Sequence, residues 1–391
     1  LIAGAEAGAS ARAARKQGIP ARTAAEPTGE DVEIGDTRLG ASSQEVSAGL
    51  APPPFLYPIL ESAVAHHAGR DLDAQRRFLG GFMARATEVA ATHPDLAWFP
   101  KAAAADELSE PTPDNRMIAE PYTKRMNAII EVDQAAALLL CSVEAAEAAG
   151  IPRDRWVFPL GVADLNDVFY PLERPELHRS PAVETAGRAL FDAVGCGLDD
   201  VSRFDFYSCF PVAVEISASA LGLDLADRRP FTVTGGHAYF GGPGNNYTTH
   251  SIATMAGELR EDAGAIGLTT GLGWYVTKHS IGLWSTTPPS AGFVKPDLRE
   301  AQAAIDATAL AQAPSGAAGP ATVDGWTIIH DRDAGPTTVV AYATTVERQR
   351  VAVRRDDPAL AAELSGGRLI GATIDVVPRA DASASFELTG A

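Results

Sequence analysis

Between Arg203 and Trp284 the chain reads RFDFYSCF (203–210), GGHAYFGGPG (235–244) and TTGLG (269–273), three polar or glycine-rich runs in close succession. A short apolar strand pattern precedes each of these runs. Apolar residues at helical spacing follow the first run as far as Leu221 and the second run over 247–260. In open α/β folds, ligands bind at turns between strand ends and helix starts. The stretch therefore predicts an α/β fold with a site at these turns.

Two interpretations of the glycines stay open. Glycine lets a backbone approach a ligand closely, and helix N-termini offer unpaired N–H donors to carbonyl or phosphate oxygens. Such a pocket suits an acyl thioester or a nucleotide tail. Alternatively, the glycines only make tight turns between strands and helices. Three polar or glycine-rich turns in one stretch favour a binding site.

Composition limits the class of protein. The 391 residues are 46% hydrophobic, which supports a large core, and the net charge of −18 argues against nucleic acid as a partner. No apolar run is long enough to span a membrane. The three cysteines, Cys141, Cys196 and Cys209, show neither zinc-ligand spacing nor a disulfide framework. We expect a soluble cytoplasmic protein without a metal.

The rest of the chain predicts alternating elements. The opening Leu1–Ala7 reads as an apolar strand without an initiator Met, so we expect the sequence to begin inside a longer protein. Segments 20–54 and 93–121 are predicted to be surface chain, and 133–141 a fully buried strand with Cys141 in the core. Predicted helices cover 59–67, 72–89, 143–149 and 181–194.

The three runs resemble, in order and spacing, the C-terminal signatures of the thiolase superfamily: Phe206–Phe210, Gly235–Pro243 and Thr269–Gly273. The resemblance implies a thiolase-like layered α/β/α/β/α fold. It also implies that the N-terminal half is incomplete and that the helix carrying the acyl-accepting cysteine precedes this sequence. No residue of this sequence can then be named as that nucleophile.

Three positions depart from the family pattern. Tyr207 stands where thiolases place an Asn or His that holds an oxyanion-hole water. Gly242 replaces the His of their Gly-His-Pro motif, and Thr269 replaces their acid/base cysteine. A threonine hydroxyl exchanges protons far less readily than a thiol at neutral pH.

Nearby groups are candidates to replace the lost catalytic side chains: Cys209, His237 and His250, with His279 close by. Cys209 begins a helix, whose dipole is expected to lower the thiol pKa. The alternative is that each is packed or holds its own turn. The residues expected to border bound substrate are Tyr207, Phe210, Gly235, Gly236, Gly241, Gly242, Asn246, Thr269, Gly271 and Gly273. Asn246 is alternatively a helix N-cap.

Beyond a helix at 298–310 and an Ala-, Pro- and Gly-rich linker at 312–320, a new domain is predicted. Short strand patterns at 326–330, 337–345, 351–353 and 369–377, with a helix near 358–364, are typical of a small β-barrel. This domain and the GGHAYFGGPGNNY run resemble the actinobacterial thiolase-like proteins of type 1, whose appended domain is OB-like. The predicted divisions are 1–126 and 127–290 for the two thiolase-like parts, 291–319 for the helix and linker, and 320–391 for the barrel.

Two function classes follow from the resemblance. The first is an acyl-CoA-dependent enzyme of lipid metabolism, similar to acetyl-CoA acetyltransferases, which uses the thioester as a substrate and needs no other cofactor. The second is a catalytically inactive thiolase-like protein that binds CoA, a CoA thioester or a protein partner. Thiolases commonly form dimers or tetramers, so a homo-oligomer is also an expectation.

Overall fold

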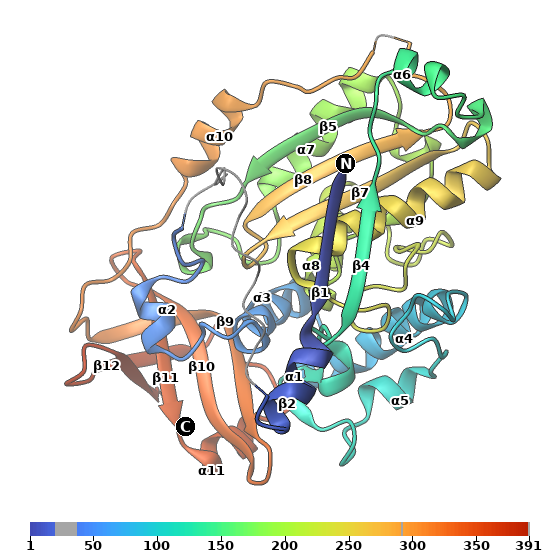
Figure 1. Ribbon diagram of the computed structural model, residues 1–391. Coiled ribbons are helices and arrows are strands. Elements are labelled where there is room, and N and C mark those ends of the chain that lie inside the picture. The colour runs from blue at the N-terminus through green and yellow to red at the C-terminus, as the bar shows by residue number, and fades with distance from the viewer. Residues whose placement is uncertain (20–36, 291, 390–391) are drawn as a thin grey trace.

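The computed structural model of the protein describes residues 1–19, 37–290 and 292–389. At its centre lies a four-stranded sheet with the strand order β5-β8-β7-β6 (Figure 1). Strands β6 and β7 are parallel, and the other two pairings are antiparallel. The strands are β5 (Phe158–Asn166), β6 (Val201–Asp205), β7 (Ile266–Gly273) and β8 (Lys278–Ser285).

Helices cover both faces of this sheet. Side chains alternate along β8: Ile281 and Leu283 enter the main core, whereas Trp284 packs beside the small cluster that contains Met255. Helix α7 accordingly packs on β5 and β8 from one face, and α9 packs on β6 and β7 from the other. The mixed helix and sheet content confirms the α/β class. The helices are α7 (Pro181–Val194), α8 (Pro211–Ala220) and α9 (Tyr247–Glu261).

The two ends of helix α7 could be predicted because the residues at each end are typical of helix termini. The Ser180 hydroxyl accepts a hydrogen bond from the Val183 N–H at 3.1 Å, and Pro181 occupies the first turn, where no N–H is needed. Gly195 ends the helix at φ +79°, in the left-handed region that glycine adopts easily. The helix predicted over 181–194 is confirmed.

Two predictions in the central stretch are wrong. No strand forms before Gly235, because Asp205 rather than a strand partner accepts the hydrogen bonds of the Val233 and Thr234 N–H groups. Gly271 and Gly273 lie inside β7, and the hairpin turn comes later. In that turn Trp274 and Val276 adopt positive φ, a conformation that usually favours glycine. The glycines of the sequence therefore do not indicate where the turn lies.

Strands β1 (Ile2–Ala7) and β4 (Asp133–Leu138) form an antiparallel ribbon, from which α1 (Gly8–Lys16) and α6 (Val143–Ala148) extend. The prediction that 133–141 is a fully buried strand is wrong. Alternate side chains of β4 are exposed because no other strand of the described residues pairs with the ribbon. Cys141 is exposed rather than part of the core.

A helical layer lies beside the two sheets, and its helix α3 (Pro53–His67) contacts both α8 and the C-terminal strands. The other members of this layer are α2 (Ser43–Ser47), α4 (Leu72–Ala91) and α5 (Ala105–Ser109). The prediction that 20–54 and 93–121 are surface chain is wrong in part. Helix α2 carries a buried capping box at Ser42 and Glu45, and Leu108 of α5 is buried. Strand β2 (Met117–Ala119) pairs with both β3 (Tyr122–Thr123) and β9 (Gly319–Asp331). Residues 20–36 of the predicted 20–54 excursion lie outside the described residues.

The C-terminal strands form a second sheet with the path β11-β10-β9-β12-β13, to which β2 and β3 attach (Figure 1). No ladder joins β11 to β13 among the described residues, so barrel closure stays a prediction. The predicted domain boundaries likewise remain predictions. The elements are α10 (Arg299–Asp306), β9 (Gly319–Asp331), β10 (Gly335–Thr345), β11 (Arg350–Asp356), α11 (Pro358–Leu364), β12 (Thr373–Pro378) and β13 (Ala384–Leu388).

Both faces of β10 are buried. Val339 and Ala341 point into the core of the C-terminal sheet, whereas Val340 and Tyr342 join the main core. The predicted linker is partly packed, since Ala313 is buried and its N–H donates to the Arg350 carbonyl at 2.9 Å. The C-terminal sheet is therefore joined to the rest by a shared core.

Candidate functional site

The loop between β6 and α8 is held by aromatic stacking. Phe210 is buried between Tyr57, at a ring-centroid distance of 4.2 Å, and Tyr122, at 5.8 Å. The Tyr207 N–H donates to the Thr270 hydroxyl on β7 at 2.8 Å. These contacts bring the first signature run against the third, as the sequence predicts.

Cys209 faces Tyr57 of α3. Its Sγ donates to the Tyr57 hydroxyl at 3.3 Å, and that hydroxyl donates to the Trp274 carbonyl at 2.6 Å. Burial raises the pKa of the Cys209 thiol to about 12. The expected lowering by the helix dipole is therefore wrong, because desolvation of the thiolate outweighs the dipole. Cys209 is a neutral thiol at physiological pH.

His237 lies in a closed aromatic environment. Its ring stacks on Tyr247 at 3.5 Å and tilts against Tyr207 at 4.2 Å. The His237 Nδ1 is 3.4 Å from the Ser208 hydroxyl, while Nε2 is buried and has no hydrogen-bond partner among the described residues. Burial holds the pKa of His237 well below its usual value, so the ring is neutral.

Asp205 lies beside these rings and was not among the residues predicted for the site. Its fully buried carboxylate accepts hydrogen bonds from the hydroxyl groups of Thr232 at 2.8 Å and Thr234 at 3.1 Å, and from Tyr247 at 3.2 Å. Burial raises the pKa of Asp205, and the hydrogen bonds oppose the rise. An aspartate inside the apolar run Phe204–Asp205–Phe206 was the available signal, because buried charges need partners.

The glycines of the second run are packed against protein atoms. A Cβ at Gly235 would lie 2.5 Å from the Ala90 Cβ, and one at Gly236 would lie 2.6 Å from the Ser208 Oγ. Gly241 is similarly close to the Gln134 side chain. All three have positive φ. At these positions the tight-turn interpretation accounts for the glycines without a ligand.

At Gly242 a Cβ would lie 3.0 Å from the Ile129 carbonyl oxygen. This contact is tighter than nine in ten Cβ contacts in proteins, so the Ile129 carbonyl would have to shift. The position that carries a catalytic histidine in thiolases therefore has little room for a side chain here.

The third run is also committed to internal contacts. The Thr269 hydroxyl accepts a hydrogen bond from the Trp284 Nε1–H at 2.8 Å. A Cβ at Gly271 would lie 2.5 Å from the Ser280 Oγ, and one at Gly273 would lie 3.3 Å from the Lys278 Cβ. These glycines let β7 and β8 approach each other closely.

His250 is separate from Cys209 and His237. It lines a cleft of about 550 Å³ together with Gln134 and Phe240, and its buried Nε2 has no partner among the described residues. Burial lowers the His250 pKa. Asn246 does not cap α9 with its side chain; its amide donates to the Gly4 carbonyl at 2.7 Å and ties β1 to this region.

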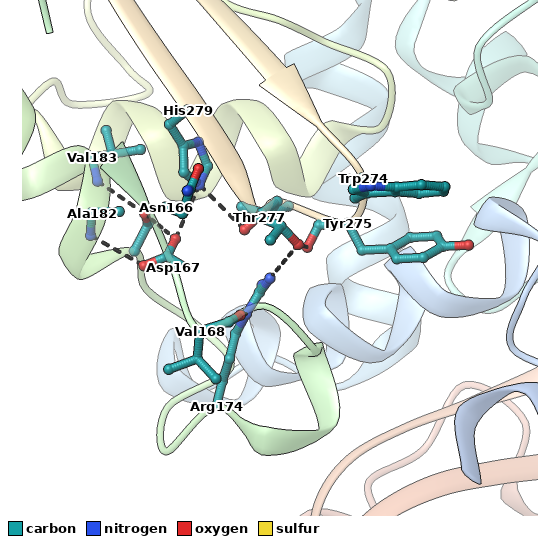
Figure 2. Close-up of polar contacts among 12 residues, drawn as sticks. Asn166, Asp167, Val168, Arg174, Ala182, Val183, Trp274, Tyr275, Thr277 and His279 are labelled. Atoms are coloured by element: carbon teal, nitrogen blue, oxygen red, sulfur yellow. Dashed lines mark hydrogen bonds and ion pairs between the residues drawn. The ribbon is translucent and has the colours of Figure 1, made fainter. Parts of the chain in front are cut away.

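The turn between β7 and β8 is braced from below, as Figure 2 shows. The buried Asp167 carboxylate is 3.0 Å from His279 Nε2 and accepts from the Ala182 N–H at 3.1 Å. Arg174 Nη2 donates to the Thr277 hydroxyl at 2.7 Å. His279 therefore holds the turn that presents Trp274 and does not reach the other candidate residues.

The structure thus brings Tyr207, Gly236 and His237 together around Ser208, with Cys209 and Phe210 beside them. His250 and Gly241 lie near Gln134, and Thr269 belongs to the sheet. The described residues contain no cluster of three or more His, Cys, Asp or Glu side chains that could hold a metal ion. In the same ranges, no helix is long and apolar enough to cross a bilayer.

Comparison with known proteins shows a similarity to solved structures. The fold is similar to the crystal structure of a monomeric SCP2-thiolase-like protein type 1 from Mycobacterium smegmatis, with a TM-score of 0.82 and 35% sequence identity. The match covers 89% of this chain and 76% of the other. No protein-family model and no curated protein matches the sequence.

Proposed function

The chain belongs to the SCP2-thiolase-like proteins of type 1. We propose that it binds CoA or an acyl-CoA thioester and that the residues described here do not catalyse thiolysis. The ligand would lie at the edge where the loops after β6 and around 235–244 meet. The same family membership supports a cytoplasmic role in lipid metabolism.

The observation behind the inactive assignment is that the three positions that differ from thiolases all make internal contacts. Tyr207 is packed against the His237 and Tyr247 rings, and Gly242 is closed off by the Ile129 carbonyl. The Thr269 hydroxyl is occupied by Trp284. A general acid or base must reach the reacting atoms, and none of these groups is arranged to do so.

His237 supports ligand binding at this place. Its Nε2 is buried without a hydrogen-bond partner among the described residues, although buried polar atoms are rarely left unpaired. A thioester carbonyl or a CoA amide that supplies this partner would recover the hydrogen bond. The same atom favours a second candidate function, acyl transfer assisted by His237.

The experiment is calorimetry of the purified full-length protein with CoA, acetyl-CoA and a longer acyl-CoA, alongside a thiolysis assay. Binding without turnover supports the proposal, and His237→Phe should weaken that binding. His66→Gln, at an exposed position of α3, is the control. Failure of CoA and of every acyl-CoA to bind would overturn the proposal, and thiolysis that depends on His237 would establish the second candidate.

Two further expectations belong to this proposal. The Arg355 Nη1 donates to the Phe386 carbonyl at 3.1 Å and so links β11 to β13, which supports an OB-like closed barrel. The similar mycobacterial protein is described as monomeric, which favours a monomer over the expected homo-oligomer. Light scattering after size-exclusion chromatography distinguishes the two states.

A further inference from the structure

A second cleft lies away from the candidate site. It has a volume of about 1000 Å³ and is bounded by the C-terminal end of α3, by α7 and by the C-terminal half of α8. None of the predicted site residues lines it. Its apolar lining includes Val64, Phe191, Ile216 and Leu221. The cleft is therefore large enough and apolar enough for a small amphipathic molecule.

One cation of this cleft, Arg70, is held by a hydrogen bond at Nε, by stacking and by a long ion pair. The Arg70 Nε donates to the Gln75 Oε1 at 2.5 Å, and the guanidinium carbon lies 4.1 Å above the Phe78 ring. Among the described residues neither Nη group makes a hydrogen bond, and the Glu215 carboxylate is 3.8 Å away. An arginine held in this way offers its planar fork to an anion at little entropic cost.

Two buried carboxyl groups, Glu61 and Glu215, lie behind Arg70. Glu215 and Glu61 are buried and share the Gln75 Nε2 as a donor, at 3.0 Å and 2.5 Å. Burial raises the pKa of both carboxyl groups, and the neighbouring Glu61 raises that of Glu215 further. Both carboxyl groups therefore ionise less readily than exposed glutamates do.

Other basic groups of the cleft are either paired with carboxylates or stacked. Arg179 and Arg188 both bind Glu184, at 2.6 Å and 2.9 Å. His67 and His178 stack on each other at a centroid distance of 4.2 Å and face the same space. Among the described residues that line the cleft, Arg70 is the arginine whose fork is not hydrogen-bonded to a carboxylate.

We propose that this cleft binds a small amphipathic carboxylate, with its head group on Arg70 and its hydrocarbon chain along Val64, Ile216 and Leu221. The carboxylate matches the arginine fork, and the chain removes apolar surface from water. The proposal does not depend on CoA binding at the other site.

The test is calorimetric titration of the full-length protein with decanoate, with decanol as the uncharged comparison. We expect one decanoate per chain, and binding about tenfold weaker for Arg70→Met, which removes a charge-assisted hydrogen bond but keeps the side-chain stem. Arg77→Met is the matched control, because Arg77 is an exposed arginine that does not line the cleft.

A second variant guards against misfolding of the first. Ser219 is exposed at the cleft wall, so Ser219→Trp should fill the space and abolish decanoate binding without disturbing the core. Three results would overturn the proposal: no decanoate binding, equal binding of decanol, or binding that both cleft variants leave unchanged. Since the probe and variants differ from those of the CoA experiment, the two proposals can fail separately.

Discussion

At the scale of single residues, Cys209 combines a helix N-terminus, which favours a thiolate, with burial, which opposes it. Burial dominates and places the pKa at about 12. We expect Cys209 to react slowly with iodoacetamide between pH 7 and 9, whereas exposed Cys141 reacts quickly in the same sample. Mass spectrometry of tryptic peptides measures both rates. Equal rates at the two cysteines would contradict a partly buried, neutral thiol at Cys209.

Gly242 tests the inactive assignment. Gly242→His should not give thiolysis, because Tyr207 and Thr269 also differ from the family pattern. It should also destabilise the fold by about 1–3 kcal/mol, since its Cβ crowds the Ile129 carbonyl. Gly257→His is the control, because a Cβ there meets nothing within 4 Å. Unfolding in urea measures stability, and robust thiolysis by Gly242→His would disprove the assignment.

At the scale of elements, the Glu61–Glu215 pair joins α3 to α8 and makes stability depend on pH. The unfolded chain releases these protons near the ordinary glutamate pKa of 4.5, whereas the folded chain keeps them to higher pH. The folded state therefore binds more protons in this window, and stability falls as pH rises. The free energy of unfolding begins to fall near pH 4.5 and continues to fall until the pH exceeds the raised pKa values of the two folded-state carboxyl groups.

Glu215→Gln keeps the hydrogen bonds but cannot ionise. The variant should lose less stability than the native protein between pH 5.5 and 8, as measured by urea unfolding at both values. Glu184→Gln, on exposed α7 surface, is the control. An identical loss in the native and Glu215→Gln proteins would show that the pair is not the source. Glu45 and Asp205 also have raised pKa values, so only the difference between variants is informative.

The brace under the β7–β8 turn gives another prediction. Asp167→Ala leaves His279, Ser180 and the Ala182 N–H without their acceptor and should cost about 3 kcal/mol of unfolding free energy. Asp164→Ala, in strand β5 just before Asp167, removes an exposed pair with Lys295 and should cost less than about 1 kcal/mol. Chemical denaturation gives both values, and comparable losses would mean that the brace contributes little.

The elements differed in how far sequence could predict them. Helix α7 carries its own start and stop residues, so local chemistry was sufficient. The β7–β8 turn was misplaced because the chain holds Trp274 and Val276 at positive φ through tertiary contacts, with glycines nearby serving another purpose. The site was predicted in part: the grouping of Tyr207, Gly236 and His237 followed from motif order, whereas Asp205 depends on partners that are distant in sequence.

At the scale of the whole molecule, Tyr342 of β10 connects the C-terminal sheet to the helical layer. Its hydroxyl donates to Glu45 at 2.5 Å. Tyr342→Phe should lower stability by about 1–3 kcal/mol, because it removes a donor from a buried carboxyl group. Tyr239→Phe should be nearly neutral, since the Tyr239 hydroxyl has no hydrogen-bond partner in the described part of the chain.

Because the two sheets share a core, we expect calorimetry to show one cooperative unfolding transition in the native protein and one in the Tyr342→Phe variant. A separate early transition in Tyr342→Phe would mean that the C-terminal sheet unfolds independently. The sequence suggested an independent domain because the Ala-, Pro- and Gly-rich segment resembles a linker. The sequence could not reveal that β10 has two apolar faces because one packs on the main core and the other on the core of the C-terminal sheet.

The shared core also constrains the order of events during synthesis. Ile59 of α3 lies against Gly325 of β9, a residue that leaves the ribosome long after it. Until β9 and β10 emerge, the apolar surface that they cover on α3 stays open to solvent. The growing polypeptide must therefore protect this surface, by transient collapse or by a chaperone, while the residues between α3 and β9 are being made.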